Sequence, residues 1–456
     1  MSGPAPARRC AFAVLFAVAR RGAYAHLALE QELAGRRLAP EDAALASEIT
    51  RGAMTWQRLL DRWIDRLAKG RRPDPAVAVI LRMALYQLRF LDRVPAYAAL
   101  SDAVELAKER APHAAAFVNG VLRAATRETE WERPLADGCG GRAGACCPEE
   151  APAPEALALS PAEFALRASY PDWLAACVGE ALGERAGRAA LLALNRRPVR
   201  TLRVNRLRAA RADVLASLCA AGVDAEPSPC APEGIRLPPG VNPVQLQVYR
   251  DGLCSLQGES SMLIAPLLEP RPGMAILDAC AAPGGKAAHI AELADDRARV
   301  TAVDLHPHRA ALVRAAAARL HLTSVRVETA DARSLRGRYD AVLLDAPCSG
   351  IGTIARKPDL KWRLTPGALR ELADLQAELL LALADAVRPG GLFVYSTCTL
   401  AAAENERQIE RFLAARPDFC AAPFALSGGE VAGTARILPQ SFGGDGFFVA
   451  RMIRSV

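Results

Sequence analysis

Apolar residues recur at helical spacing through the first 127 residues of the chain. The segments 45–49, 59–64 and 79–88 place them three or four positions apart, which puts them on one face of a helix. The strict alternation of a half-buried strand is absent from this region. Residues 1–127 are therefore predicted to form an all-α domain.

The helical pattern ends in a stretch rich in proline and glycine, which runs from residue 128 to 159. Such a composition predicts a flexible linker. The linker contains Cys139, Cys146 and Cys147, but no nearby histidine could complete the four ligands of a zinc site. We interpret the three cysteines as free thiols and assign no metal to the chain.

Two mixed regions follow the linker. Residues 201–204 and 234–237 have the composition of strands and flank a helical segment near 209–221, which predicts a small α/β subdomain over residues 160–250. From residue 251 to 456 strands and helices alternate regularly, a pattern typical of a parallel sheet built from βαβ units. The chain is thus expected to be multidomain, with an all-α domain first and a Rossmann-like α/β domain last.

Composition agrees with several globular domains. The 456 residues are 51% hydrophobic and 23% charged, which supplies apolar material for more than one core. Lysines and arginines number 57 against 50 acidic residues, so the net charge of +7 is compatible with a phosphate-bearing partner without identifying one. Twelve cysteines in a chain of this length do not indicate a disulfide scaffold, which favours a reducing, cytoplasmic location.

The N-terminal apolar stretch resembles a signal peptide only superficially. Arg8 and Arg9 precede a mostly apolar stretch, but Arg20 and Arg21 follow it at once, and the apolar positions suit one helix face. No apolar run approaches the roughly 18 residues that a membrane span needs. We therefore expect a helix of the first domain here, whose arginines either add an RNA-binding face or are simply solvated.

A strand, a turn of small residues and a helix follow one another between residues 274 and 293. The turn contains Pro283, Gly284, Gly285 and Lys286, and its small side chains let backbone N–H groups approach a ligand closely. It has neither the spacing of a Walker loop nor that of a dinucleotide-binding glycine loop. The turn therefore predicts a ligand of another kind.

Three further strands each lead to an acid. Asp304 ends the next strand, Asp331 follows the third, and Asp345 ends the fourth. In an open α/β sheet ligands bind beyond the carboxyl ends of the strands, where Asp304 would suit the hydroxyls of a ribose and Asp331 the edge of an adenine. The alternative is that these acids cap helices or lie in exposed turns.

Cys348 follows the fourth strand, 339–345, and Cys398 follows a further apolar strand, 391–397. Because both cysteines lie at the carboxyl ends of sheet strands, their thiols are expected to face the same crevice as the small-residue turn. Buried cysteines that merely fill space are the alternative interpretation.

Three segments, 278–286, 345–350 and 396–399, resemble the motifs of the S-adenosylmethionine-dependent RNA cytosine-5 methyltransferases. Residues 116–123 resemble the end of the NusB fold, an RNA-binding helical domain. Together the segments resemble the RsmB/Sun-type family, which acts on 16S (small-subunit) ribosomal RNA. The resemblance implies a NusB-like N-terminal domain, a small α/β RNA-binding subdomain, and a class I S-adenosylmethionine-dependent methyltransferase domain over residues 251–456.

The resemblance also implies site residues. Cys398 would be the nucleophile, Cys348 would serve product release, and Asp345 would lie near the methyl donor and the target base. The turn and the strand-end acids would hold S-adenosyl-L-methionine through Cys280, Ala281, Ala282, Pro283, Gly284, Gly285, Lys286, Asp304, Asp331 and Asp345. The partner would be 16S ribosomal RNA, free or in an early assembly intermediate, bound by a monomer.

Two thiols suit cytosine-5 chemistry. C5 of cytosine is a poor nucleophile until a thiolate adds to C6 and pushes electron density onto C5. A thiol of ordinary pKa, ~8.5, is mostly protonated at neutral pH, so a cation such as Lys286 should help it to ionise. A protonated carboxyl at Asp345 could donate to N3 of the base, as acids kept neutral by burial do.

A basic segment follows Cys348. Its charged side chains could hold RNA phosphates near the site, and they are Arg356, Lys357, Lys361 and Arg363. Alternatively the segment is a solvated approach to a helix, with Trp362 filling a gap between domains. The target base must leave its stack, which is least costly in unpaired loops.

Some residues depart from the family pattern, and other functions stay open. Gly258 stands where the family has an acid, and Ala287 replaces a threonine after Lys286. A DNA cytosine-5 methyltransferase would attack with the Pro-Cys thiol and would not need Cys398. The remaining alternatives are a methyltransferase for another RNA and a non-catalytic RNA-binding or antitermination factor with a degenerate catalytic half.

Overall fold

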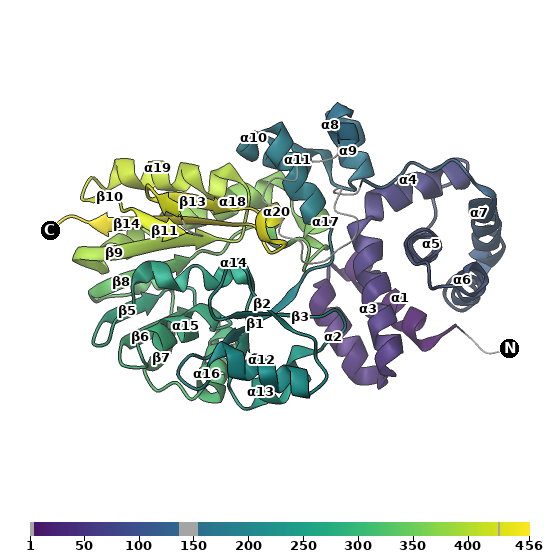
Figure 1. Cartoon of the computed structure of the whole chain (residues 1–456). Helices are drawn as coiled ribbons and strands as arrows, with labels where there is room; N and C mark the ends of the chain where they lie inside the picture. Colours follow the sequence, from purple (N-terminus) through teal and green to yellow (C-terminus); the bar gives the residue numbers. More distant parts are fainter. Residues whose placement is uncertain (1–3, 136–153, 427–428) are drawn as a thin grey trace. The chain divides into compact units, whose positions relative to one another are not determined.

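A computed structural model describes residues 4–135, 154–426 and 429–456 (Figure 1). The described chain folds into two compact units. The first holds residues up to 135, residues 154–179 and Ile354–Arg363, and the second holds the rest. Residues 160–179, expected with the small α/β subdomain, thus lie in the first unit. The linker cysteines Cys139, Cys146 and Cys147 fall outside the described residues.

The first unit is helical, as its apolar spacing predicts. Buried apolar side chains such as Leu59, Trp63 and Leu85 form its core, and Asp74 begins one helix by accepting the amides of Ala76 and Val77. Its helices are α1 (Pro6–Arg21), α2 (Ala25–Arg36), α3 (Pro40–Thr55), α4 (Gln57–Leu67), α5 (Pro75–Phe90), α6 (Ala96–Arg110), α7 (Ala115–Arg127), α8 (Pro154–Ala158), α9 (Pro161–Arg167) and the single turn α17 (Leu360–Arg363).

The second unit begins with a small antiparallel sheet. Helix α10 (Asp172–Leu182) spans the boundary between the units, and α11 (Glu184–Ala193) precedes the sheet. The strand order is β2-β3-β1-β4, and α12 (Arg211–Ala220) packs Val214 and Leu218 against Leu202 and Ile235. The strands are β1 (Arg200–Val204), β2 (Glu226–Pro227), β3 (Gly234–Leu237) and β4 (Cys254–Leu256).

The larger sheet of the second unit has the strand order β10-β14-β9-β8-β5-β6-β7, with β13 paired to β14. The five strands β5 to β9 are parallel to one another, as predicted, whereas β14 runs antiparallel to β9 and adds a mixed edge that the sequence pattern did not predict. The strands are β5 (Ala275–Asp278), β6 (Arg299–Asp304), β7 (Val325–Thr329), β8 (Tyr339–Asp345), β9 (Val387–Thr397), β10 (Phe419–Ala421), β13 (Thr434–Ile437) and β14 (Phe447–Arg454).

Helices cover both faces of this sheet (Figure 1), so its central strands β5 and β8 are mostly buried and apolar, whereas the edge strand β7 is partly exposed and carries Arg326 and Glu328. Along β8, Ala341 and Leu343 pack into the core that includes α15 (Gly285–Leu293), while Val342 and Leu344 pack into the core that includes α18 (Pro366–Ala384). Helices α16 (Pro307–Arg319) and α19 (Glu406–Ala415) complete the two layers. This burial leaves the strand ends as the place where polar side chains gather.

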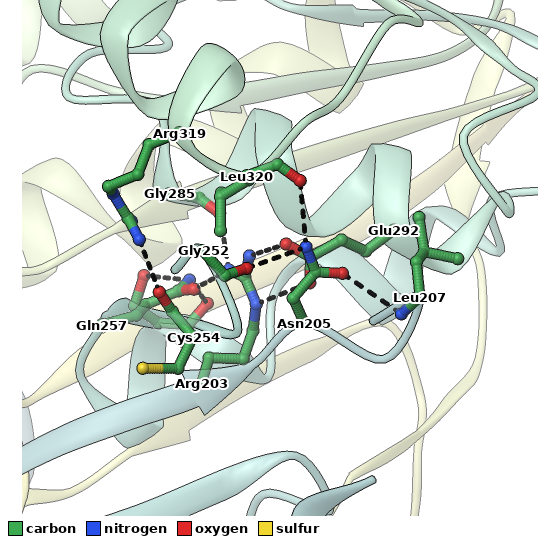
Figure 2. Close-up of polar contacts among 11 residues, drawn as sticks. Arg203, Asn205, Leu207, Gly252, Cys254, Gln257, Gly285, Glu292, Arg319 and Leu320 are labelled. Atoms are coloured by element: carbon green, nitrogen blue, oxygen red, sulfur yellow. Dashed lines mark hydrogen bonds and ion pairs between the residues drawn. The ribbon is translucent and has the colours of Figure 1, made fainter. Parts of the chain in front are cut away.

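A buried ion pair joins the small sheet to the larger one (Figure 2). Arg203 on β1 lies 2.7 Å from Glu292 on α15, and both side chains are completely buried. Arg203 also donates to the carbonyl of Gly285 at 2.7 Å and to the side chain of Gln257. Because Gly285 opens α15, the arginine supports the turn that precedes this helix. Removing one partner of such a pair typically costs about 3–5 kcal/mol.

Within the described ranges, no helix combines the length and apolar character that crossing a bilayer requires.

Candidate active site

The thiols of Cys348 and Cys398 converge. Strands β8 and β9 pair in parallel with Asp345 opposite Ser396, and the two cysteines follow these strand ends. Their sulfur atoms lie 3.4 Å apart, close enough for one thiol to donate a hydrogen bond to the other. Both sulfurs therefore lie together beyond the carboxyl ends of β8 and β9.

Hydrogen bonds fix the backbone on both sides of the thiol pair. The amide of Ala346 donates to the carbonyl of Ser396 at 2.8 Å, and the amide of Gly352 donates to the carbonyl of Cys398 at 3.0 Å. Gly352 also accepts the amide of Gly446 at 2.8 Å. An added Cβ on Gly352 would lie 2.0 Å from the Gly446 carbonyl oxygen, so only glycine fits there.

A buried glutamate, Glu404, organises the loop after Cys348. It accepts the Ser349 amide at 2.8 Å and the side chain of Gln376 at 2.9 Å, and Ser349 bonds Thr399 at 2.7 Å. Burial raises the pKa of Glu404, while its hydrogen bonds act in the opposite direction. Sequence reasoning missed this residue, because a lone glutamate between strand and helix carries no recognisable spacing.

Lys286 and Asp345 form an ion pair beside the thiols. The Lys286 ammonium lies 2.6 Å from one oxygen of Asp345, and the Ser396 hydroxyl donates to the other at 2.7 Å. Burial opposes the charge on Lys286, but the attraction of Asp345 outweighs it, and the negative form of Cys398 adds to it, so the pKa of Lys286 is raised. Lys286 thus supplies a lasting positive charge next to Cys398.

The two thiols have unequal surroundings. The hydrogen bond with Cys398, followed by burial, raises the pKa of Cys348 well above its ordinary value. Cys348 therefore keeps its proton and can donate it toward a thiolate on Cys398.

The turn between β5 and α15 is shaped for close approach. Gly284 has φ +105°, and a Cβ there would lie 3.0 Å from the Cα of Val313, so the position requires glycine. The amide of Ala281 donates to Val303 and that of Gly284 to Ala281, which tightens the turn. Burial raises the pKa of Cys280 to about 12, so this thiol stays protonated and unreactive at neutral pH. Ala282, Pro283 and Gly285 complete the turn.

Asp278, the last residue of β5, is a polar group that the site prediction did not include. It is completely buried, and neither carboxylate oxygen has a hydrogen-bond partner among the described residues. Burial and then repulsion from Asp345 raise its pKa to about 7. Two buried acceptors without donors fit a ligand that brings N–H or ammonium groups. Its position at a strand end, like that of Asp304, is the feature by which the sequence could have indicated Asp278 as a site residue.

The other two acids differ in exposure. Asp304 is buried at the end of β6 and accepts the His306 amide at 3.1 Å. Asp331, after β7, is half-buried and accepts both the amide and the guanidinium of Arg333, which lowers its pKa. Asp331 thus caps a short turn, as the alternative interpretation had it, while its place at the strand end is the expected one.

The basic segment divides into solvent-facing and buried members. Lys357 is exposed and Arg356 half-buried, whereas Lys361 has 0% exposure and donates to carbonyls of the first unit. Arg363 stacks 3.7 Å from the ring centroid of Tyr24. Lys361 is therefore inaccessible to RNA phosphates in this structure.

The arginines of α1 also divide. Arg8 is buried and bonds Gln87 and Asp102 inside the first unit, and Arg9 pairs with Glu109. Arg20 and Arg21 are exposed at the end of the helix. Of these four arginines, Arg20 and Arg21 are the exposed pair.

In the described ranges no group of three or more His, Cys, Asp or Glu side chains could hold a metal ion.

Comparisons with known proteins agree with this arrangement. The chain matches the NusB family over residues 5–127, a ferredoxin-like domain of RsmF/B-like methyltransferases over 170–244, and 16S rRNA methyltransferase RsmB/F over 265–453. It is 35% identical to probable ribosomal RNA small subunit methyltransferase B of Bacillus subtilis (strain 168), over 98% of both chains. It is 36% identical to ribosomal RNA small subunit methyltransferase B of Xylella fastidiosa (strain Temecula1), over 91% of this chain and 89% of that one.

A solved structure, that of PH0851, covers 100% of both chains with a TM-score of 0.79 and 26% identity. Fold, site and matches define a multidomain methyltransferase that carries a NusB domain and a ferredoxin-like domain. The chain belongs to the RsmB/F family of 16S rRNA methyltransferases. The predicted fold class and family are confirmed.

Proposed function

We propose that this enzyme transfers a methyl group from S-adenosyl-L-methionine to C5 of a cytosine in 16S ribosomal RNA, through a covalent bond between Cys398 and C6. The observation that carries the proposal is the 3.4 Å approach of Cys348 and Cys398, next to the Lys286–Asp345 pair. The RNA substrate is proposed because relatives of nearly equal length are named as small-subunit ribosomal RNA methyltransferases.

The cofactor fits the residues present. Asp278 offers two buried acceptors without partners among the described residues, Gly284 lets the turn pack tightly against Val313, and Asp304 lies at the next strand end. We assign the turn to the methionine part, Asp304 to the ribose and Asp331 to the adenine region. When bound there, S-adenosylmethionine supplies an electrophilic methyl group.

The chain's own residues then act on the base. Cys398, as thiolate, adds to C6, and electron density moves toward N3 and C5. The Lys286 charge favours the thiolate, and it holds Asp345 beside the base edge. Asp345 accepts hydrogen bonds from Lys286 and Ser396 on its two oxygens, and we assign it the contact with N3 of the base. C5, now nucleophilic, takes the methyl group.

Release reverses the first step. The proton on C5 leaves to a base, the C5–C6 double bond re-forms, and the sulfur of Cys398 departs as the leaving group. Cys348 is 3.4 Å from that sulfur and keeps its proton, so it can donate a hydrogen bond to the departing thiolate or position a base. General acid–base help of this kind contributes roughly 10²- to 10⁴-fold.

Mechanism-based trapping tests the proposal. RNA containing 5-azacytosine should form a covalent band on a denaturing gel with the wild-type enzyme and S-adenosylmethionine, and DNA of the same sequence should not. Cys348→Ala should accumulate an adduct on ordinary RNA, because attack proceeds while release slows. An adduct that survives in Cys398→Ala would contradict the assignment of the nucleophile.

The alternatives give other outcomes. A DNA enzyme would trap on DNA through Cys348, and a non-catalytic antitermination factor would trap on neither and would not bind S-adenosylmethionine by calorimetry. Trapping on RNAs other than the 16S species would indicate a different RNA substrate. Bisulfite sequencing of ribosomal RNA from cells with and without the gene would locate the cytosine.

A further inference from the structure

One arginine of the small sheet, Arg203 on β1, is completely buried against helix α15 of the larger sheet (Figure 2). Its Nε and Nη2 atoms lie 3.2 and 2.7 Å from the two carboxylate oxygens of Glu292. This is the bidentate geometry in which a guanidinium binds a carboxylate with the greatest specificity. The third nitrogen, Nη1, is thereby left for other acceptors.

Nη1 of Arg203 reaches the turn that we assign to the methionine part of the cofactor. It donates to the carbonyl of Gly285 at 2.7 Å and to the side-chain oxygen of Gln257. Gly285 is the first residue of α15, and Glu292 lies in the last turn of the same helix. One side chain thus contacts both ends of α15, including the residue where the cofactor turn becomes helix.

Gln257 supports the same turn. Its Nε2 atom donates to the carbonyl and the hydroxyl of Ser261 at 3.2 and 3.1 Å, so its oxygen is directed toward Arg203. A Cβ on Gly285 would lie 3.6 Å from the Cδ atom of Gln257, which is ordinary van der Waals contact. The turn therefore rests on two side chains whose own positions are fixed by further hydrogen bonds.

The strand that carries Arg203 is itself anchored to helix α16. The side-chain amide of Asn205, two residues further along, donates to the carbonyl of Leu320 just beyond α16 at 3.2 Å. Arg319 of α16 donates to the carbonyl of Cys254 at 2.8 Å, and Cys254 lies on β4, which pairs with β1. Arg203 thus reaches the turn from a strand that is held in place independently.

Stability alone does not account for the buried pair. Taking two charges out of water is costly, and apolar residues of similar volume often stabilise a protein as well or better. An apolar side chain in place of Arg203 could not, however, donate to the Gly285 carbonyl. The contribution specific to the arginine is a fixed shape of the turn.

We propose that Arg203 is a positioning residue, which holds residues 281–286 in the shape that binds S-adenosylmethionine by donating to Gly285. Glu292 and Gln257 direct the arginine. The inference rests on the proposed function for the place of the cofactor. It gives the small sheet a role in cofactor binding, because a turn already held in its binding shape avoids the cost of ordering a loop when the ligand binds.

The test compares Arg203→Met with Arg236→Met. Arg236 is also a buried arginine of the small sheet, and it lies 2.8 Å from buried Glu259 on α14 (Glu259–Met262), so both changes remove an arginine from a buried ion pair. Arg203→Met should weaken S-adenosylmethionine binding about tenfold, the loss expected if the turn keeps its binding shape about a tenth of the time. Arg236→Met should bind the cofactor within about twofold of wild type by calorimetry.

Steady-state kinetics separate positioning from catalysis. In Arg203→Met, KM for the cofactor should rise about tenfold while kcat at saturating cofactor stays within about threefold of wild type, because the turn regains its shape once the cofactor is bound. Arg203→Lys should lose about threefold in affinity. An ammonium keeps the charge opposite Glu292 but lacks the planar fork that also reaches Gly285.

A second readout needs neither cofactor nor RNA. Amide hydrogen exchange in residues 281–288 of the unliganded protein should be at least about tenfold faster in Arg203→Met than in Arg236→Met, because the turn loses its restraint. If Arg203→Met fails to fold, Arg203→Lys decides the question by the same measurements, with an expected change of about threefold in affinity and in exchange.

The outcomes separate this inference from the proposed function. Wild-type cofactor affinity and unchanged exchange in folded Arg203→Met or Arg203→Lys would overturn the positioning role. Equal losses in Arg203→Met and Arg236→Met would also overturn it, because they would indicate general destabilisation. A wild-type enzyme that binds S-adenosylmethionine but forms no adduct with RNA would overturn the covalent mechanism, and the binding comparison would still decide the role of Arg203.

Discussion

Lys286 and Lys361 are both buried lysines that follow strand ends, yet they lie in opposite electrostatic surroundings. Lys286 pairs with Asp345, and its pKa is raised because that attraction outweighs burial. Lys361 donates to backbone carbonyls and an aromatic face, and burial lowers its pKa well below the ordinary value. The ion pair keeps Lys286 charged and available for chemistry, whereas the carbonyls and the aromatic ring around Lys361 give that lysine a structural role.

The pKa shifts have opposite consequences for stability. Lys286 stabilises the fold fully below the pKa of an unfolded lysine, ~10.4, and that contribution is lost as pH rises through its higher folded pKa. For Lys361 the folded protein binds fewer protons than the unfolded chain between its lowered pKa and ~10.4, so stability rises with pH there. The comparison concerns two regions, the thiol site and the buried surroundings of Lys361 in the helical unit.

The largest effect is expected when the Cys398 thiol, which lies beside the charge of Lys286, is removed. Cys398→Ala should lower methyl transfer by roughly 10⁴-fold or more, because it removes the sulfur that forms the covalent bond to C6. Affinity for S-adenosylmethionine should change little, since the cofactor turn lies on another strand end. Transfer of labelled methyl to RNA and calorimetry of the cofactor measure the two quantities. Retained turnover would contradict the nucleophilic role.

The next largest effect is expected when the charge of Lys286 is removed. Lys286→Met should lower kcat by about 10²- to 10³-fold, because the Cys398 thiolate loses its cation and the Asp345 carboxylate is left unpaired. Single-turnover rates at saturating RNA and cofactor measure this loss. An unchanged rate would contradict a role for the Lys286 charge in the reaction.

Much of this arrangement could be predicted from sequence. Apolar runs that end in Asp304, Asp345 and the two cysteines located the strand ends, because parallel strands bring their carboxyl ends to one edge. The partners of those residues could not be predicted. Glu404 and Ser396 meet the thiol loop only through tertiary packing, and nothing in their spacing announces it.

Lys361 shows the other limit. A basic run beside a reactive cysteine favours phosphate contacts on charge alone, and only packing reveals that this lysine fills a seat between two helix ends. The antiparallel edge made by β14 was likewise hidden, because strand direction depends on the connection and not on apolar content. The position of Asp278 at a strand end could be read from the sequence. Only the structure shows that its carboxylate oxygens have no hydrogen-bond partner among the described residues.

A smaller effect sharpens the contrast between paired and unpaired groups. The pKa of Asp278 is raised to about 7 by burial, so the folded protein binds more protons than the unfolded chain between ~3.9 and that value. The contribution of Asp278 to stability should therefore fall as pH rises from about 4 to 7, and Asp278→Asn should lose this part of the dependence and gain up to about 4 kcal/mol over wild type at pH 8. Melting temperatures at pH 5 and 8 measure the difference.

The same variant should bind S-adenosylmethionine more weakly, because it loses one of two acceptors at the strand end. Melting curves that shift in parallel for Asp278→Asn and wild type would show that the carboxyl does not titrate as placed. The paired acid Asp345 provides the contrast, since Asp345→Asn leaves Lys286 without its partner and should lower stability.

The smallest effect separates two lysines of one segment. Lys357 is exposed four residues before buried Lys361, so Lys357→Met should leave α17 docked and act only on RNA. KM for RNA should rise about two- to fivefold, and the slope of log affinity against log salt should decrease by roughly one, because one phosphate contact is lost. Filter binding from 50 to 200 mM salt measures the slope. A fall in kcat with no change in that slope would contradict a phosphate contact by Lys357.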